Sequence, residues 1–306
     1  MSGLRAGVLL ALLLFTAPAA AAEWSVEVTS HFRFETPRKN ARALAPLVAV
    51  AEEVRTRHCA LIEPCFTQTI TVKVLPESES FRRAQPGSHI DWAAGIAYTE
   101  KDLILLRLDD GQMLNLVETF EHEVSHIALL NAVPGRPPQW FIEGLAILQA
   151  KQDLISRFEA AAGAALHGNL IAFSDLHRGF PGSASGRRLA YAQSGLFLHF
   201  LQGRLGGPEG LREVITRMVD GASIHAAVLA VSGRSLDDLE ADWRDTLAGV
   251  RPWIISLRDS WWLWTGMAFL FLFAVFVKTR RIRRRKKQMV EEESEWEYRD
   301  KGQTLH

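Results

Sequence analysis

One segment in the middle of the chain, from Met113 to Val133, constrains the fold more than any other. Apolar residues recur there at steps of three and four, which is the spacing of one buried face on an α-helix. The residues on this face are Leu116, Val117, Phe120, Val124, Ile127 and Ala128. Pro134-Gly135 follows directly and ends the pattern, because proline cannot continue a helix. The sequence therefore predicts one long amphipathic helix at this place.

The predicted helix carries His122-Glu123-Val124-Ser125-His126. Residues four positions apart lie one above the other on the same helix face, so both imidazoles can hold one metal ion. Glu123 follows the first histidine and can reach a water molecule on that metal. This is the H-E-x-x-H arrangement of zinc hydrolases. Because a five-residue pattern also arises by chance, its surroundings decide what it means.

The next segment offers a third ligand. A catalytic zinc site takes three ligands from the protein and leaves one position for water, so two histidines are one ligand short. Glu143 is the only carboxylate between Glu123 and Lys151, and the residues around it are apolar. A lone acidic side chain there is costly to bury unless a positive charge satisfies it, as a zinc ion would. Pro137-Pro138 precedes a second predicted helix, from Gln139 to about Gln152, which can pack on the first.

In the rest of residues 23–252, all predicted strands come before the helix at 113–133, and only helices are predicted after it. Period-two alternation predicts strands at 25–34, 69–75 and 102–108, and an apolar stripe predicts a helix at 41–58. Further helices are expected at about 190–205, 209–220 and 236–249. No repeat or low-complexity linker interrupts this body. The sequence therefore predicts one α+β domain.

Both ends of the chain carry targeting signals. Residues 1–22 have a basic start, a short apolar run and small residues, which predicts a secretory signal peptide, with an uncleaved anchor as the alternative. Residues 260–277 are uncharged and just long enough to cross a bilayer. Eight of the ten residues at 278–287 are basic, which predicts a cytoplasmic tail at 278–306. The domain would then be extracytoplasmic, and periplasmic if the source is bacterial. A buried core helix and a nucleic-acid-binding tail are the alternatives for this end.

The chain has two cysteines, Cys59 and Cys65. Export to an oxidising compartment favours a disulfide between them over two free thiols. Two cysteines are also too few for a cysteine-rich metal site.

A second motif follows the predicted helix at 113–133. Pro138-Gln139-Trp140-Phe141-Ile142-Glu143-Gly144-Leu145-Ala146 has the form P-x-W-F-x-E-G-L-A. Together with the H-E-x-x-H sequence, it resembles the gluzincin zinc metallopeptidases, and in particular their membrane-associated, peptidase-MA-like branch. Weaker similarity at 190–198 and 233–244 extends the resemblance over residues 100–248. It implies a small mixed sheet whose edge strand runs beside the active-site helix, followed by a helical lobe.

The resemblance also implies roles for single residues. His122, His126 and Glu143 would bind Zn²⁺, and Glu123 would be the general base. Zinc lowers the pKa of a bound water towards 7, and Glu123 would accept the proton of that water. Tyr191 is the candidate for stabilising the oxyanion, with a purely structural role in the core as the alternative. The alternative for the whole cluster is that both histidines are ordinary helix residues and that Glu143 caps a helix or pairs with an arginine.

One departure from the family pattern concerns the groups that orient the ligands. Several gluzincins have a carboxylate one turn after the third ligand, but Ile147 stands at that position. Glu118, Glu121 or another segment would orient the ligands instead, with both glutamates solvated on the outer helix face as the alternative description of them.

The sequence thus predicts a membrane-anchored zinc peptidase that hydrolyses polypeptides with a zinc-bound water activated by Glu123. The alternatives are an inactive gluzincin-like domain that binds peptides or protein partners at the membrane, and a zinc hydrolase of non-peptide amides. An endopeptidase is favoured over an aminopeptidase, because no anchor for a substrate N-terminus is recognisable. The glycine-rich loops lack the context of a nucleotide site, and no nucleic-acid partner is expected. The sequence predicts no particular oligomeric state.

Overall fold

The computed structural model describes residues 24–76, 78–87, 90, 92–108, 113–249, 264–283 and 285. The chain divides into two units, which are described separately. The first unit ends at Leu247, and the second begins at Ala248. The expected signal peptide at 1–22 and the chain beyond residue 285 lie outside the described residues.

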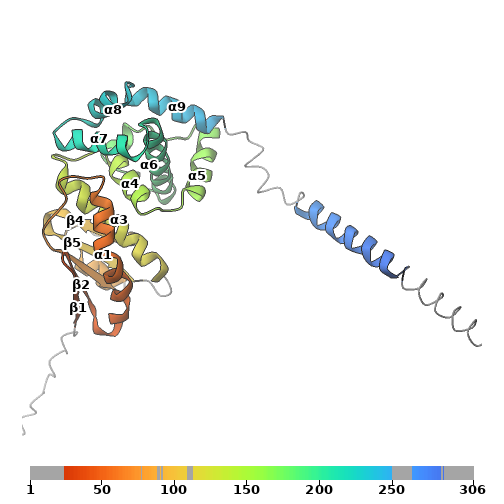
Figure 1. Cartoon of the computed structure of the whole chain (residues 1–306), viewed down its shortest axis with the longest axis horizontal. Helices are drawn as coiled ribbons and strands as arrows, with labels where there is room; N and C mark the ends of the chain where they lie inside the picture. Colours follow the sequence, from red (N-terminus) through yellow and green to blue (C-terminus); the bar gives the residue numbers. More distant parts are fainter. Residues whose placement is uncertain are drawn as a thin grey trace, which may run out of the picture. The chain divides into compact units, whose positions relative to one another are not determined.

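A five-stranded mixed sheet forms one layer of the first unit (Figure 1). Its strands are β1 (Trp24–Val28), β2 (Phe32–Pro37), β3 (Ile70–Leu75), β4 (Gly95–Tyr98) and β5 (Leu103–Arg107). The order across the sheet is β1-β2-β3-β5-β4. The two inner pairs, β2–β3 and β3–β5, are parallel, and the two outer pairs are antiparallel. Among the described strands, β1 and β4 are therefore the edges of the sheet.

The predicted strands are confirmed in part. Those at 69–75 and 102–108 are β3 and β5. The single strand expected at 25–34 is wrong, because a turn divides this segment into the β1–β2 hairpin, with the N–H of Thr29 donating to the carbonyl of Phe32. The turn contains neither glycine nor proline, so the sequence does not mark it. β4 was not predicted from the sequence. It has four residues, which are too few to show the alternation of apolar and polar residues that marks a strand.

Helices cover one face of the sheet. Alternate side chains of the central strands are fully buried, namely Phe32, Phe34, Val72, Val74, Ile104 and Leu106. They share a core with α1 (Leu44–Cys59), which follows a 3₁₀ helix at Arg38–Ala43, and with α3 (Met113–Ala132). The ring of Phe120 in α3 lies 5.3 Å from that of Phe32 and 5.6 Å from that of Phe34. The helices predicted at 41–58 and 113–133 are confirmed, and the first begins at Leu44.

A shorter helix covers part of the opposite face. Phe81 of α2 (Ser78–Ala84) packs with Leu75 and Leu105 in a small separate core. A further 3₁₀ helix, Thr99–Lys101, connects β4 and β5. β5 is thus buried on both faces, which explains its nearly continuous apolar run, whereas β2 and most of β3 are fully buried on one face only.

A helical lobe follows the sheet in sequence and in space (Figure 1). It contains α4 (Gln139–Gln149), α5 (Leu154–Leu166), a 3₁₀ turn (Asp175–His177), α6 (Ala184–Arg204), α7 (Pro208–Val219), α8 (Ile224–Ser232) and α9 (Leu236–Ala248). An aromatic cluster of Trp140, Phe173, Phe197 and Trp243 joins α4, α6 and α9, with ring centroids 4.4 to 5.5 Å apart. The predicted helices at 190–205, 209–220 and 236–249 are confirmed. The first begins earlier than expected, because the Ser183 hydroxyl caps it at the N–H of Gly186.

Two glycines let α4 and α6 approach closely. A Cβ on Gly144 would lie 2.6 Å from the backbone carbonyl oxygen of Ser194, and a Cβ on Gly195 would lie 2.8 Å from Cγ2 of Ile147. Neither space can hold a methyl group without displacing a helix. The contact therefore fixes the position of α4 along α6.

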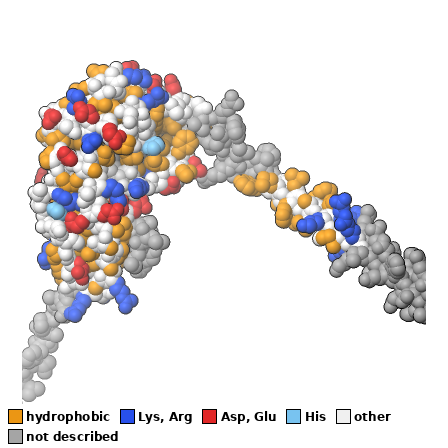
Figure 2. All heavy atoms as spheres, in the orientation of Figure 1, with side chains coloured by type: hydrophobic (Ala, Val, Ile, Leu, Met, Phe, Trp, Pro, Cys, Tyr) orange, Lys and Arg blue, Asp and Glu red, His pale blue; other side chains and the backbone are white. Residues whose placement is uncertain are grey.

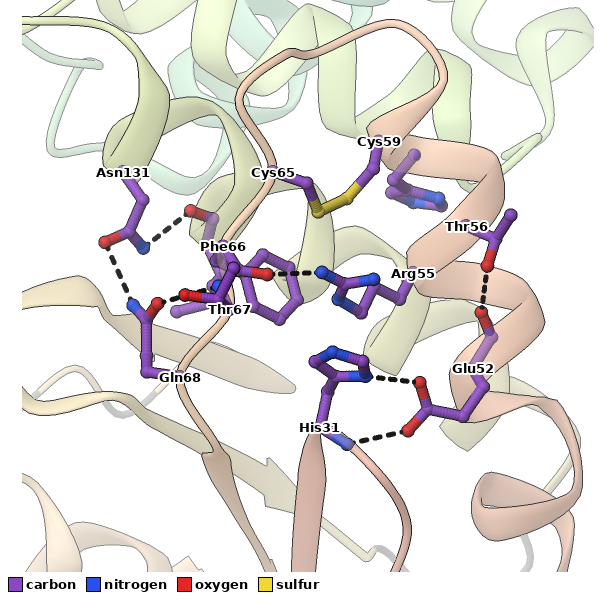
Figure 3. Close-up of a disulfide and its surroundings, with 12 residues drawn as sticks. His31, Glu52, Arg55, Thr56, Cys59, Cys65, Phe66, Thr67, Gln68 and Asn131 are labelled. Carbon is purple, nitrogen blue, oxygen red and sulfur yellow. Dashed lines mark hydrogen bonds and ion pairs between the residues drawn. A yellow bond between two sulfur atoms is a disulfide. The ribbon is translucent and has the colours of Figure 1, made fainter.

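A disulfide links the end of α1 to the loop before β3 (Figure 3). Cys59 and Cys65 are bonded, with their Cα atoms 5.3 Å apart, so the expected bridge is confirmed. Beside it, the guanidinium of Arg55 lies 5.0 Å from the ring centroid of Phe66 and donates to that residue's carbonyl. The disulfide and this contact hold the loop on α1.

The described part of the second unit is a helix at 264–283. Among the described residues, no helix combines the length and the apolar character that crossing a membrane requires. The span expected at 260–277 begins at four residues that the structure does not describe. The C-terminal transmembrane part of the expected fold therefore stays a prediction.

His58 makes the stability of the first unit sensitive to acid. Its side chain is 1% exposed, and its Nε2 lies 3.0 Å from the backbone carbonyl of Glu121. Burial lowers the pKa of His58 from 6.5 to about 4. The unfolded chain then binds a proton at a pH where the native state does not, so stability is lost as the pH falls from about 6.5 to 4. The shift corresponds to about 3 kcal/mol of unfolding free energy.

We expect this loss in denaturant unfolding of the metal-free protein in EDTA, measured from pH 7 to pH 4. The His58→Gln variant, which has no group that titrates there, should lose about 3 kcal/mol less than the wild type over this range. His199→Gln, at an exposed position of α6, is the matched control and should behave as the wild type. Parallel stability curves for wild type and His58→Gln would contradict the assignment.

Candidate metal centre and its cavity

The two histidines of the first motif lie on one face of α3. Their ring centroids are 4.8 Å apart, with the ring planes nearly perpendicular at 89°. Both Nε2 atoms face one carboxylate oxygen, Oε2 of Glu143 in α4, at 3.2 Å from His122 and 3.6 Å from His126. The side chains are 9 to 13% exposed. The packing of α4 on α3 therefore brings together the three residues that the sequence predicts as ligands.

Glu143 is held in this orientation by its own helix. Gln139, one turn earlier in α4, donates from Nε2 to Oε1 of Glu143 at 2.7 Å. One carboxylate oxygen is thus occupied by the amide, and the other is directed at the imidazoles. The ligand atoms of His122, His126 and Glu143 all lie within 4.8 Å of one another.

The electrostatics of the cluster favour a cation. Burial lowers the pKa of His126 to about 4, so its imidazole is neutral near pH 7 and has a free lone pair. Burial alone would raise the pKa of Glu143, but the two histidines and the hydrogen bond from Gln139 bring it below its ordinary value. Burial alone would lower the pKa of His122, but the hydrogen bond to Glu143 and the charges of Glu123 and Glu143 raise it. The carboxylates thus favour positive charge at the imidazoles, which a proton on His122 or a bound cation can supply. Two imidazole nitrogens and one carboxylate oxygen form a ligand set that suits zinc, so the residues fit the expected ion.

The expected orienting carboxylates are not found at the histidines. Glu121 is bound by Arg57, 2.8 Å from its Oε2, and its carbonyl faces His58. Glu118 lines the cavity and, among the described residues, forms no hydrogen bond to either histidine. The buried Nδ1 atoms of His122 and His126 have no hydrogen-bond partner in the described part of the chain. Neither replacement proposed for the position of Ile147 is therefore confirmed.

Glu123 is buried beside the cluster and against the sheet. It is 5% exposed, and burial raises the pKa of its carboxyl to about 7, with the backbone amide of Ala97 partly opposing the rise. A Cβ on Gly95 would lie 2.7 Å from Oε1 of Glu123 and 2.7 Å from Cγ2 of Thr119. Only glycine lets β4 come this close to α3. The edge strand thus runs beside the helix that carries the histidines, as the family resemblance implies.

Tyr191 enters the same site from α6. Its ring packs edge-on against Phe180 at 4.9 Å and Trp92 at 6.3 Å. Burial raises the pKa of Tyr191, and the charges of Glu143 and Glu123 raise it further, so its hydroxyl stays protonated. The structure therefore places Tyr191 at the cavity, within electrostatic reach of both carboxylates.

A cavity of about 1170 Å³ opens in front of these residues. Its wall includes His122, Glu123, His126, Glu143 and Tyr191, together with β4 and parts of α5 and α6. β4, Trp92 and Arg157 belong to this site and were not predicted from the sequence. The only local signal for β4 is Gly95 within an apolar segment, which is too common to indicate a site. Trp92 and Arg157 belong to no motif, and only the tertiary fold brings them here.

A comparison with protein families agrees with this arrangement. The family model described as the Peptidase MA superfamily matches residues 67–249. A comparison with curated protein sequences gives no match. Among solved structures, LTA4 hydrolase from yeast is similar with a TM-score of 0.47 and 12% identity, covering 75% of this chain and 40% of that one. An aminopeptidase N family protein from Idiomarina loihiensis has a TM-score of 0.40 and 13% identity, covering 78% of this chain and 46% of that one.

The chain thus spans less than half the length of these two proteins. The family match covers more than half of the present chain, including both motifs and α3 to α9. The chain belongs to the Peptidase MA superfamily.

Proposed function

We propose that this protein is a zinc-dependent peptidase. The observation that carries the proposal is the convergence of His122, His126 and Glu143 within 4.8 Å, beside a buried Glu123 and at the wall of a large cavity. Membership of the Peptidase MA superfamily supports a peptidase over other hydrolases. His122 and His126 would hold the zinc ion through Nε2, and Glu143 through the carboxylate oxygen that faces them. Bound zinc supplies Lewis acidity, which acidifies water and polarises a carbonyl.

Glu123 has the properties of a general base. It adjoins a metal ligand in sequence, and its buried carboxyl lies at the cavity wall beside the proposed ligands, where it could reach a water held by the metal. Its carboxylate would accept a proton from the attacking water and deliver it to the leaving amine nitrogen. Gly95 keeps the carboxylate in place, because the strand leaves no room on that side.

Tyr191 would stabilise the developing oxyanion. Its protonated hydroxyl can donate a hydrogen bond, and its ring is held by Phe180 and Trp92. A donor fixed before the reaction does not have to reorganise when negative charge develops on the carbonyl oxygen.

The sheet edge would hold the peptide backbone. β4 is an edge strand of the described sheet, and Gly95, Ile96 and Ala97 line the cavity. An edge strand offers backbone donors and acceptors to an extended peptide, and these contacts do not depend on the peptide's sequence. A polypeptide laid along β4 would pass in front of Glu123.

We also propose that the domain acts outside the cytoplasm, anchored by the C-terminal segment. The disulfide between Cys59 and Cys65 is typical of an oxidising compartment. Large apolar side chains from Trp264 to Val277 are exposed along the second unit's helix, and basic side chains follow them (Figure 2). An apolar segment followed by basic residues is the order expected of a transmembrane helix whose C-terminal end lies on the cytoplasmic side.

The first test concerns the metal. We expect the purified protein to contain one zinc ion per chain, as measured by atomic emission. Removing a ligand in Glu143→Ala should weaken zinc binding roughly a hundredfold or more. Glu213→Gln, at an exposed position of α7, is the control and should keep the wild-type zinc content. Full zinc occupancy in Glu143→Ala would exclude Glu143 as a ligand.

The second test concerns hydrolysis, with peptide-library cleavage followed by mass spectrometry. Glu123→Gln should lower kcat by roughly 10²–10⁴-fold, because the amide cannot accept the proton. Tyr191→Phe should lower it roughly a hundredfold through loss of one oxyanion donor. Both variants should keep their zinc. Wild-type protein that binds peptides and cleaves none would instead indicate the inactive, peptide-binding alternative.

The third test concerns the anchor. We expect the full-length protein in the membrane fraction of cells, released by detergent and retained at alkaline pH. A variant that ends at residue 249 should be recovered in the soluble fraction, because it lacks the apolar segment. Protease added from the outside should degrade the domain at residues 24–249 and leave the C-terminal tail. Full-length protein in the soluble fraction would overturn the proposed anchoring.

A further inference from the structure

The cavity beside the candidate metal centre has an uneven charge. Apart from Glu123 and Glu143, its wall carries four arginines and two carboxylates among the described residues. These are Arg136, Arg157, Arg187 and Arg188, and Glu118 and Asp153. Three of the arginines come from α5 and α6, on the helical side of the cavity. With Glu123 and Glu143 included, the described part of the wall holds four arginines and four carboxylates, so the charge is uneven in position and not in number. The arginines gathered on the helical side attract negatively charged groups of a ligand to that side.

Arg157 is less exposed than Arg136 and Arg188 on the same wall. It lies in the first turn of α5, and its side chain is half-buried. Burial lowers its pKa, so the guanidinium is partly withdrawn from water. It interacts electrostatically with Tyr191 and Glu143, which places it on the same side of the cavity as the proposed catalytic groups. The charge of Arg157 is therefore close to the position of a bound peptide.

The contacts of Arg157 with the described residues leave most of the hydrogen-bond donors of its guanidinium unused. Its Nη2 donates a hydrogen bond to Oε1 of Gln152 at 2.7 Å. Glu118 and Asp153 act on it electrostatically, but no carboxylate in the described part of the chain is within ion-pair distance. A guanidinium has five N–H donors in a planar fork, and a neutral amide accepts from one of them. A half-buried arginine with this many unused donors is suited to a carboxylate from outside the chain.

Arg187 extends the charge towards the cavity mouth. Its guanidinium lies 4.6 Å from the ring centroid of Trp92 and donates to the carbonyl of Gly182. Trp92 in turn packs against Tyr191. The aromatic ring and the carbonyl hold Arg187 at the rim, so a ligand does not have to order it.

We propose that Arg157, with Arg187 at the rim, forms a carboxylate-binding subsite that selects peptides with an acidic group near the bond to be cleaved. This rests on the proposed peptidase function. An unmodified polypeptide has two sources of carboxylate, the Asp or Glu side chain and the C-terminal α-carboxylate. Either would form a bidentate pair with the fork of Arg157.

The experiment measures peptide binding to full-length Glu123→Gln protein, so that bound peptides stay intact. The probes are pairs of fluorescein-labelled peptides that differ in one carboxylate. In one arm, Asp or Glu is compared with Asn or Gln at each position in turn. In the other, a free C-terminus is compared with a C-terminal amide. The ratio of the two Kd values, from fluorescence anisotropy, reports the carboxylate preference.

We expect one arm to show a preference of roughly ten- to hundredfold for the carboxylate, the range of hydrogen bonds to charged groups. Adding Arg157→Gln should reduce the ratio to about one. Arg157→Lys should give an intermediate ratio, because an ammonium keeps the charge and loses the planar fork. Arg212→Gln, at an exposed position of α7 outside the cavity wall, is the matched control and should keep the full ratio. Circular dichroism and zinc content of each variant verify that it is folded.

The outcomes separate this proposal from the peptidase function. Equal binding of both members of every pair, or an unchanged preference in Arg157→Gln, overturns the subsite. Cleavage of the same peptides by the wild-type protein tests the function independently. Cleavage without a carboxylate preference leaves the peptidase and removes the subsite. An Arg157-dependent preference without cleavage keeps the subsite and removes the peptidase, and no binding of any peptide removes both.

Discussion

The close contact between α4 and α6 fixes the position of Glu143, on which the candidate metal centre depends. Gly144 lies against the backbone of Ser194, and Gly195 lies against Ile147, so each helix has a glycine where the other comes closest. A side chain at either glycine would push α4 and α6 apart. Glu143 would then move away from the position in which it faces the histidines. The position of Glu143 relative to α3 is therefore set by packing on the far side of α4, in the helical lobe.

This arrangement explains why a buried carboxylate is tolerated. Glu143 is 7% exposed, in a helix whose other residues are almost all buried and apolar. One of its oxygens is satisfied by Gln139 in the same helix, and the other faces the imidazoles of α3. His126 is neutral near pH 7, whereas the neighbouring carboxylates raise the pKa of His122, so positive charge is favoured at this place. The same burial that would be unfavourable in an ordinary core is favourable around a divalent cation.

The sequence predicted the parts of this site that have a strong local signal. The period of α3 and the lone Glu143 in an apolar helix are patterns within a few turns of one element, and the structure brings them together as expected. β4 and Arg157 have no such signal. A four-residue strand is shorter than the alternation needed to recognise it. A single arginine in α5 is indistinguishable in sequence from a solvated surface charge, and only the tertiary fold places it beside the cavity. The β1–β2 turn was missed for the same reason, since its residues continue the strand pattern.

In the proposed peptidase, the two layers of the domain would have different roles. The sheet edge at β4 offers backbone groups, which bind any extended peptide, and Gly95 ties that edge closely to Glu123. Side chains that can distinguish one peptide from another come from α5 and α6, as Arg157 and Arg187 do. Substitutions in β4 are restricted by the contact with α3, whereas α5 meets the rest of the site through its side chains. Specificity can therefore change through the helical lobe while the geometry of the catalytic groups, set by α3, α4 and β4, is retained.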